Sequence, residues 1–155
     1  MLQLFLAIGA SVGSKDSCRR TLLHWAAWRS YNVGAQLLID RGADVQETDR
    51  DGATPLHLAI AALHLATHHN MTEVVQLLLR CGVDANQMRK KVWVMPGATA
   101  LQEAAWNGSE DFARLLIEAG ADVHAVDEDG ITALHQAVSN GRITCHRRLA
   151  ARPRC

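Results

Sequence analysis

The stretch Thr54-Pro55-Leu56-His57-Leu58-Ala59-Ile60 returns three more times in the chain with small changes. The related stretches are TLLHWAA at 21–27, TALQEAA at 99–105 and TALHQAV at 132–138. A second block follows the first, LLIDRGADV at 37–45, and it returns at 77–85 and 115–123. Two blocks that recur in the same order indicate an internal repeat, which organises the fold of the whole chain.

The intervals between equivalent residues give the period of the repeat. The sequence numbers of Thr21 and Thr54 differ by 33, and so do those of Thr99 and Thr132. The numbers of Thr54 and Thr99 differ by 45, which exceeds that period by 12. The glycines of the second block divide this excess into 7 extra residues before Gly82 and 5 between Gly82 and Thr99. We therefore expect two insertions, at 61–69 and 88–95, in an otherwise regular array.

The two blocks and their period resemble the ankyrin repeat, whose signature T-P-L-H-x-A recurs with the same period. The resemblance implies an all-α solenoid of helix-turn-helix units joined by β-hairpin loops. Residues 4–12 match the second block, so the chain opens with a partial repeat at 1–16. Four repeats follow, at 17–49, 50–94, 95–127 and 128–155, and together they form one domain over 1–155. The last repeat departs from the pattern at Arg148. Its five arginines suit a solvent-facing cap, and the equal alternative is a truncated chain whose next repeat is missing.

The repeated residues have local structural reasons. Each Thr that opens the first block is expected to cap a helix through its hydroxyl, and Pro55 suits a first helical turn. Gly42 and its equivalents are expected to end the second helices in a left-handed conformation. Asp49-Arg50-Asp51-Gly52 and residues 127–130 predict tight hairpin turns. His24, His57 and His135 recur in register, which favours structural hydrogen bonding over catalysis.

Composition excludes several classes of protein. The 16 basic and 16 acidic residues cancel, which argues against nucleic acid as the main partner. None of the four cysteines forms a C-x-x-C pair, so we expect free thiols in a cytoplasmic protein, with the nucleus as an alternative. No apolar run is long enough to span a membrane. We expect a protein that is monomeric on its own and needs no cofactor.

The resemblance implies a non-catalytic module that binds another protein through a concave face of hairpins and first helices. Such a module acts as an adaptor, a scaffold or a regulator. Large aromatic side chains on that face are expected to contribute much of the binding energy, because they bury a large area at a small entropic cost. The expected contact residues are Trp28, Arg29, Arg50, Asp51, Trp93, Met95, Trp106, Asn107, Glu128, Asp129 and Ile131. The alternative for Trp28 and Trp106 is that both rings pack between repeats.

Three further hypotheses remain open. One is that the chain is a fragment of a larger ankyrin-repeat adaptor, such as a substrate-recognition subunit. His64 and His68 are four residues apart, a spacing suited to a metal, so a metal-dependent enzyme is a remote alternative without an obvious third ligand. Leu78, Asp84 and Asn86 have a spacing that resembles sites of asparagine hydroxylation in ankyrin hairpins.

Overall fold

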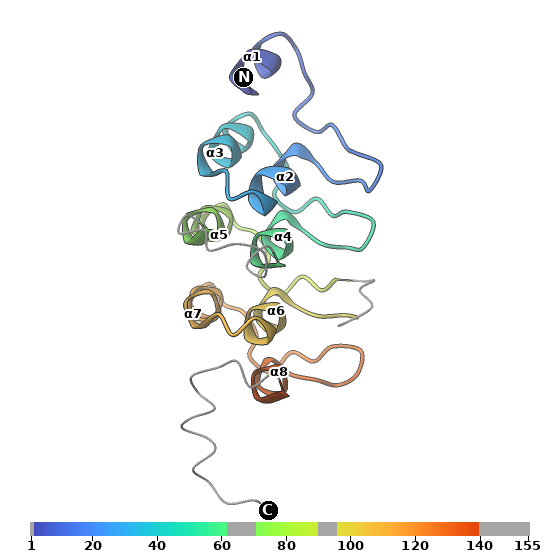
Figure 1. Cartoon of the computed structure of the whole chain (residues 1–155), viewed down its shortest axis with the longest axis vertical. Helices are drawn as coiled ribbons and strands as arrows, with labels where there is room; N and C mark the ends of the chain where they lie inside the picture. The colour runs from blue at the N-terminus through green and yellow to red at the C-terminus, as the bar shows by residue number, and fades with distance from the viewer. Residues whose placement is uncertain (1, 62–70, 90–95, 140–155) are drawn as a thin grey trace, which may run out of the picture.

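A computed structural model describes residues 2–61, 71–89 and 96–139 of the chain. The described part contains eight α-helices packed in pairs, which confirms the predicted all-α repeat fold. One layer holds the first helices of the repeats, α2 (Leu22–Trp28), α4 (Pro55–Ala61), α6 (Ala100–Trp106) and α8 (Ala133–Ser139). The other layer holds α1 (Leu2–Ala7), α3 (Asn32–Asp40), α5 (Met71–Arg80) and α7 (Glu110–Glu118). Figure 1 shows the two layers as parallel columns, with α1 at one end and α8 at the other.

The helix ends follow the local chemistry of the repeat. Thr21 and Thr99 each form a capping box, in which the Thr hydroxyl accepts a backbone bond and the third helical side chain bonds back to the cap. Pro55 is the first residue of α4, as predicted. Gly42 has a φ of 84°, so it takes the left-handed conformation expected after a second helix. Short helices of this length depend on such caps and on packing against their neighbours.

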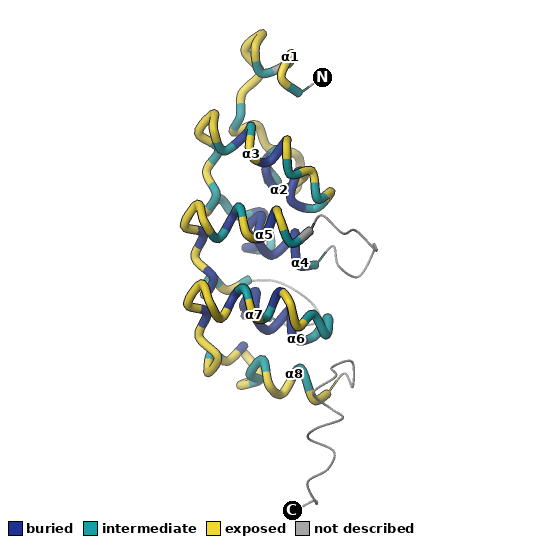
Figure 2. The backbone as a smooth tube through the Cα atoms, turned by 90° about the vertical axis from the view of Figure 1, so that its left-hand side faces the viewer, coloured by how far each residue is buried: buried dark blue, intermediate teal, exposed yellow. Residues whose placement is uncertain are grey.

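The core lies between the two layers and between successive repeats. Leu23, Leu56 and Leu78 are fully buried, and Figure 2 shows buried segments along the helices of the middle repeats. Small side chains at Ala26 and Ala104 are also buried and let neighbouring helices approach closely. Since each apolar face is covered mainly by the next repeat, stability depends on stacking rather than on any single unit.

The loops that lead into α2, α4, α6 and α8, here named hairpins 1 to 4, project from one side of the stack (Figure 1). Asp49 Oδ1 accepts hydrogen bonds from the backbone N–H groups of Asp51 and Ala53, both at 2.9 Å, which fixes the predicted turn. Asp127 holds hairpin 4 in the same way. The hairpins close through isolated β-bridges, such as that between Val126 and Thr132, and no strand forms within the described residues.

The repeated histidines have the predicted structural role. The Nδ1 atoms of His24, His57 and His135 each lie 2.8 Å from the hydroxyl oxygen of the Thr that precedes α2, α4 or α8. His24 Nε2 also lies 3.0 Å from the Ala53 carbonyl oxygen, which joins α2 to hairpin 2. In α6 a glutamine replaces the histidine, and Gln102 Nε2 donates to the Ile131 carbonyl of hairpin 4 at 2.6 Å. In α2 and α6, this position therefore connects a first helix to the next hairpin.

Candidate interaction face

Neighbouring hairpin tips are hydrogen-bonded to one another through their backbones. The Arg50 N–H donates to the Cys18 carbonyl at 3.0 Å, which joins hairpins 1 and 2. The Glu128 N–H donates to the Pro96 carbonyl at 3.1 Å, which joins hairpins 3 and 4. The tips within each pair are thus held in a fixed register, so their side chains are presented on an ordered surface.

The side chains on these tips differ in charge along the stack. Arg50 is exposed, and it occupies the same place in its repeat as the exposed Glu128. Asp129 is exposed, whereas Asp51 and Ile131 are half-buried, so all five predicted tip residues reach the surface at least in part. At neighbouring hairpin positions, Ser17 and Cys18 are exposed and Arg20 pairs with Asp49 at 3.4 Å. Ala53 and Ala98, which directly precede the Thr at the start of α4 and α6, are buried. The two alanines therefore cannot contact a partner.

A pocket of about 380 Å³ lies between hairpins 3 and 4. Met88 and Val126 line it and remain 41% and 46% exposed, while Asp127 and Glu128 add acidic groups. Arg89 also lines the pocket, and Asp127 is buried and bonded to its own hairpin, so Glu128 is the exposed acidic side chain at this place. The pocket lies next to the predicted contact residue Glu128, whereas sequence reasoning did not single out Met88.

The first helices carry the other predicted residues. Trp28 is half-buried and packs against the core, and Trp106 is also half-buried. Each side chain is therefore partly exposed, as a contact residue would be, and partly covered, as a ring between repeats would be. Arg29 is exposed. Asn107 Nδ2 donates to the Ile60 carbonyl at 3.1 Å, which links the ends of α6 and α4. Ser139, at the end of α8, is exposed, and Asn140 lies outside the described residues.

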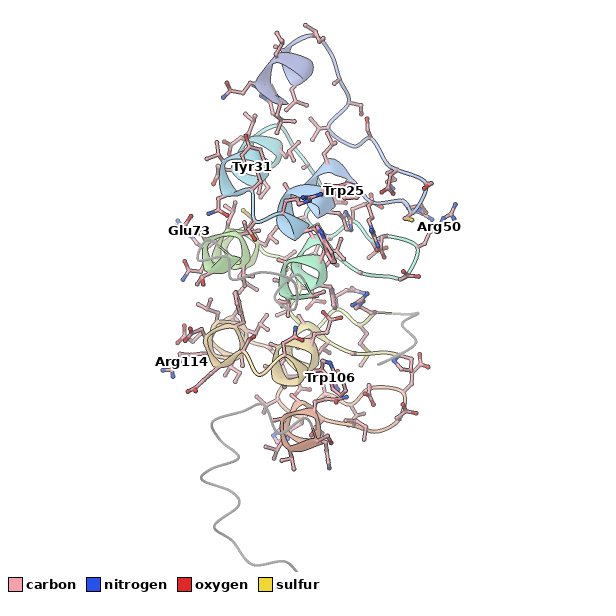
Figure 3. All side chains as sticks on the ribbon, in the orientation of Figure 1. Trp25, Tyr31, Arg50, Glu73, Trp106 and Arg114 are labelled. Carbon is pink, nitrogen blue, oxygen red and sulfur yellow. The ribbon has the colours of Figure 1, made fainter. Side chains whose placement is uncertain are left out.

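Trp25 is a surface aromatic that sequence reasoning missed. Its side chain is 41% exposed, and its Nε1 donates to Asp16 Oδ2 at 3.1 Å (Figure 3). The equivalent residues Leu58 and Glu103 are buried because α2 and α4 precede them in the first-helix layer. Within the described residues no first helix precedes α2, which leaves the indole open to solvent.

A buried ion pair joins hairpin 3 to α6. Arg89 Nη1 contacts Glu103 Oε1, and both side chains are largely buried. Burial raises the pKa of Glu103, and the Arg89 guanidinium opposes that shift. Arg89 occupies the hairpin position that Asp49 and Asp127 occupy in other repeats. Its carbonyl accepts a hydrogen bond from the Gly97 N–H, and its own N–H donates to the Ala98 carbonyl, across the enlarged hairpin. The pair therefore anchors a hairpin that lacks the usual aspartate.

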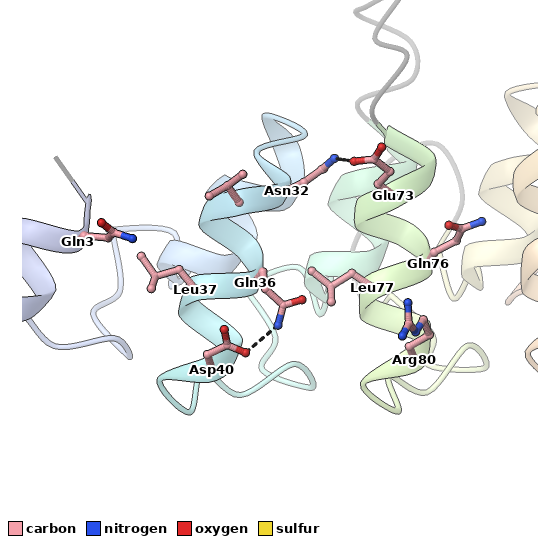
Figure 4. Close-up of a pocket in the computed structure, with 10 residues that line it drawn as sticks. Gln3, Asn32, Gln36, Leu37, Asp40, Glu73, Gln76, Leu77 and Arg80 are labelled. Atoms are coloured by element: carbon pink, nitrogen blue, oxygen red, sulfur yellow. Dashed lines mark hydrogen bonds between the residues drawn. The ribbon is translucent and has the colours of Figure 1, made fainter.

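The outer face of the second helices carries a different groove. It measures about 550 Å³ and is lined mainly by residues of α3 and α5 (Figure 4). These two helices belong to the layer away from the hairpins (Figure 1). The polar side chains of the groove bind one another, since Gln36 Nε2 donates to Asp40 Oδ1 at 2.7 Å and Asn32 donates to Glu73. None of the predicted contact residues lines this groove.

Four residues of the sequence hypotheses, Trp93, Met95, His64 and His68, lie outside the described part of the chain. Within the described ranges no group of three His, Cys, Asp or Glu side chains is arranged to hold a metal ion. In the same ranges, no helix has the length and apolar character needed to cross a membrane.

Comparison with known proteins gives one consistent family. A family model described as ankyrin repeats (3 copies) matches residues 1–62 and 63–154. Neurogenic locus notch homolog protein 1 of Xenopus laevis is 35% identical over 90% of this chain, and B-cell lymphoma 3 protein homolog of Mus musculus is 32% identical over 92%. Inversin of Mus musculus is 31% identical over 87%. The chain spans 5%, 30% and 12% of these three proteins, respectively.

Proposed function

Because the chain belongs to the ankyrin repeat family, we propose that it is a non-catalytic module that binds a partner protein through its hairpins and first helices. We propose that it acts in this way as an adaptor, a scaffold or a regulator. The exposed thiols of Cys18 and Cys81, both free, favour a reducing compartment such as the cytoplasm. The balanced charge of the sequence favours a protein over a nucleic acid as partner.

The observation that carries this proposal is the relation between Arg50 and Glu128. Their backbones occupy equivalent tips and are both bonded to the preceding hairpin, while their exposed side chains have opposite charge. A fixed pair of unlike charges at two ends of one face would select both the orientation and the register of a partner. We infer that the partner places a carboxylate near Arg50 and a basic side chain near Glu128 and the pocket beside it.

The test uses charge reversal on both faces of the folded chain. Arg50→Glu and Glu128→Arg alter the hairpin face, while Arg114→Glu and Glu118→Arg make the same charge changes on exposed residues of α7. Figure 3 shows Arg50 and Arg114 on opposite sides of the stack. Each variant is immobilised after circular dichroism confirms its helix content, and proteins captured from a lysate are quantified by mass spectrometry.

We expect one set of proteins to be depleted at least about tenfold by both hairpin variants, which corresponds to about 1.4 kcal/mol of binding free energy. The two α7 variants should retain that set. Capture that survives both hairpin reversals but is lost with the α7 reversals would place binding on the outer face. Capture that none of the four variants changes would contradict a role for either charge.

A further inference from the structure

An arginine occupies a turn position at which the other hairpins carry glycine. Arg19 is equivalent to Gly52, Gly97 and Gly130, and all four residues have a positive φ, between 64° and 76°. Residues with a Cβ rarely take this conformation, so the arginine costs backbone strain that a glycine would avoid. Arg19 is also exposed. A strained residue on an exposed tip points to a role in binding rather than in the stability of the fold.

The charges of hairpins 1 and 2 are divided between the interior of the hairpins and their surface. Three acidic side chains are held by hydrogen bonds or ion pairs within these hairpins: Asp16, Glu47 and Asp49. Asp51 is half-buried, whereas Arg19 and Arg50 are exposed and form no ion pair within the described part of the chain. Arg19 follows Cys18, whose carbonyl accepts the Arg50 N–H at 3.0 Å. Two arginines therefore project from two tips that are bonded together.

Hairpin 4 presents the opposite charge at the other end of the same side of the stack (Figure 1). Glu128 and Asp129 are exposed and form no ion pair with any described residue. Asp127 is buried and accepts backbone bonds from its own hairpin. No lysine or arginine occurs in residues 124–132. The hairpin side therefore has two arginines at one end and two carboxylates at the other.

We propose that the hairpin side binds a second copy of the same chain in an antiparallel, two-fold arrangement. This inference rests on the binding face proposed above and names a partner for it. A two-fold axis perpendicular to the stack places hairpins 1 and 2 of each copy opposite hairpin 4 of the other, so every contact occurs twice. Arg19 and Arg50 of each copy then meet Glu128 and Asp129 of the other. Residues 90–95 of hairpin 3 lie outside the described part, so no contact is assigned to them.

The equality of the two faces favours this partner and this arrangement. The separation between the arginines and the carboxylates is the same in both copies by identity, whereas an unrelated protein must match it through its own fold. Two copies in parallel would bring like charges together, which opposes binding. The contacts are exposed ion pairs, so the dimer is weak and its affinity falls as salt rises. The expectation of a monomer from sequence therefore holds only for the dilute chain.

Analytical ultracentrifugation of the full chain, over a concentration series at low and physiological salt, tests the proposal. One variant reverses the basic end, Arg19→Glu/Arg50→Glu. A second variant reverses the acidic end, Glu128→Arg/Asp129→Arg. A third variant carries all four substitutions, which exchanges the charges of the two ends. Circular dichroism and urea denaturation show whether each variant keeps the fold.

We expect the unmodified chain to form dimers that dissociate on dilution and on addition of salt. Each one-ended variant should weaken self-association at least about tenfold, because like charges then meet at both contacts. The variant with four substitutions should recover self-association, since opposite charges meet again. The matched control Arg114→Glu/Glu118→Arg, on exposed residues of α7, should behave as the unmodified chain.

Arg19→Gly separates binding from folding. The substitution removes both the charge and the backbone strain, so the urea midpoint should rise while self-association weakens. A destabilised fold cannot produce this combination. Self-association that is unchanged in this variant would overturn the proposal, because the exposed charge has then been removed without effect.

Three further outcomes would overturn the two-fold dimer. They are an unmodified chain that stays monomeric up to about 100 μM, self-association that none of the reversals changes, and a variant with four substitutions that associates no better than the one-ended variants. Lysate capture with the same four-substitution variant tests the proposed function separately, because the charges of a different partner protein are not exchanged with those of this chain. Loss of captured proteins together with a monomeric unmodified chain would keep the proposed binding face and overturn the dimer. Unchanged capture together with restored dimers would support the dimer and contradict the proposed role of the two charges in binding other proteins.

Discussion

Asn86 holds the turn of the following repeat through Asp122. Its Oδ1 accepts a hydrogen bond from the Asp122 N–H at 2.7 Å, and its Nδ2 donates to the Gly120 carbonyl at 3.2 Å. Gln46 makes the same pair of bonds one repeat earlier, to the Asp84 N–H and the Gly82 carbonyl. An amide side chain can make this bridge because it offers a donor and an acceptor on one planar group.

Asn86→Ala should lower the free energy of unfolding by about 1 kcal/mol, because two side-chain bonds between repeats are lost at an exposed site. Urea denaturation followed by circular dichroism measures the change. Gln87→Ala is the control, since Gln87 Nε2 donates to the carbonyl of its chain neighbour Met88 and not to another repeat. Equal losses in the two variants would show that the bridge to the next repeat contributes nothing.

Stability should fall with pH below neutrality because of His57. Burial, followed by the nearby Arg89 charge, lowers the pKa of His57 from 6.5 to about 3. Between these values the unfolded chain binds a proton that the folded chain does not, so unfolding becomes easier as the pH falls. Each pH unit inside that range should cost up to about 1.4 kcal/mol.

His57→Gln isolates this contribution, because Gln102 already fills the same position in α6 with its bonds intact. Urea midpoints at pH 7.5 and pH 4.5 should differ clearly in the unmodified chain and less in the variant. Glu103 acts in the opposite direction just above its ordinary pKa, since burial raises that value, and it is present in both proteins. A pH dependence that is unchanged in His57→Gln would contradict the assignment.

The ion pair of Arg89 and Glu103 should behave as a unit. Removing one partner leaves a buried charge without its counter-ion, so Glu103→Leu alone should cost about 3–5 kcal/mol. Leucine itself suits the site, because Leu58 is the buried equivalent in α4. The double variant Arg89→Met/Glu103→Leu should recover most of that loss, as measured by thermal or urea unfolding. A double variant no more stable than Glu103→Leu would show that other contacts of the carboxylate matter more.

Local signals in the sequence predicted much of the fold. Thr21, Thr99 and Gly42 determine helix ends through groups within a few residues, so their roles follow from the repeat pattern alone. The asparagine bridge and the Arg89–Glu103 pair could not be predicted, because they join residues 14 to 36 positions apart in the chain. The enlarged hairpin 3 also hides that Arg89 replaces the usual aspartate.

The candidate face was predicted only in part. The tip residues Arg50 and Glu128 are exposed as expected from their repeat positions. The exposure of Trp25 was missed, because it depends on which helix precedes α2 in the stack rather than on the residue's own position in the repeat. Trp93 and Met95 remain predictions, since they lie outside the described residues.

Gly97 and Gly120 should respond differently to the same substitution. Both have positive φ, 76° and 89°, so alanine costs roughly 1–2 kcal/mol of backbone strain at either site. A Cβ on Gly97 would also lie 2.9 Å from Glu128 Cγ and 3.1 Å from the Glu128 backbone nitrogen, whereas nothing lies within 4 Å at Gly120. Hairpin 4 would have to move away from hairpin 3, which would break the bond from Glu128 N–H to the Pro96 carbonyl.

Gly97→Ala should therefore destabilise the chain more than Gly120→Ala, and urea denaturation measures the difference. Nuclear magnetic resonance should show the Glu128 amide shifted and exchanging faster in Gly97→Ala, with little change in Gly120→Ala. If hairpin 4 carries the acidic end of the binding face, the same variant should also weaken capture of the partner set that Glu128→Arg loses. Normal partner capture by a variant whose Glu128 amide has moved would show that the register of hairpins 3 and 4 is not needed for recognition.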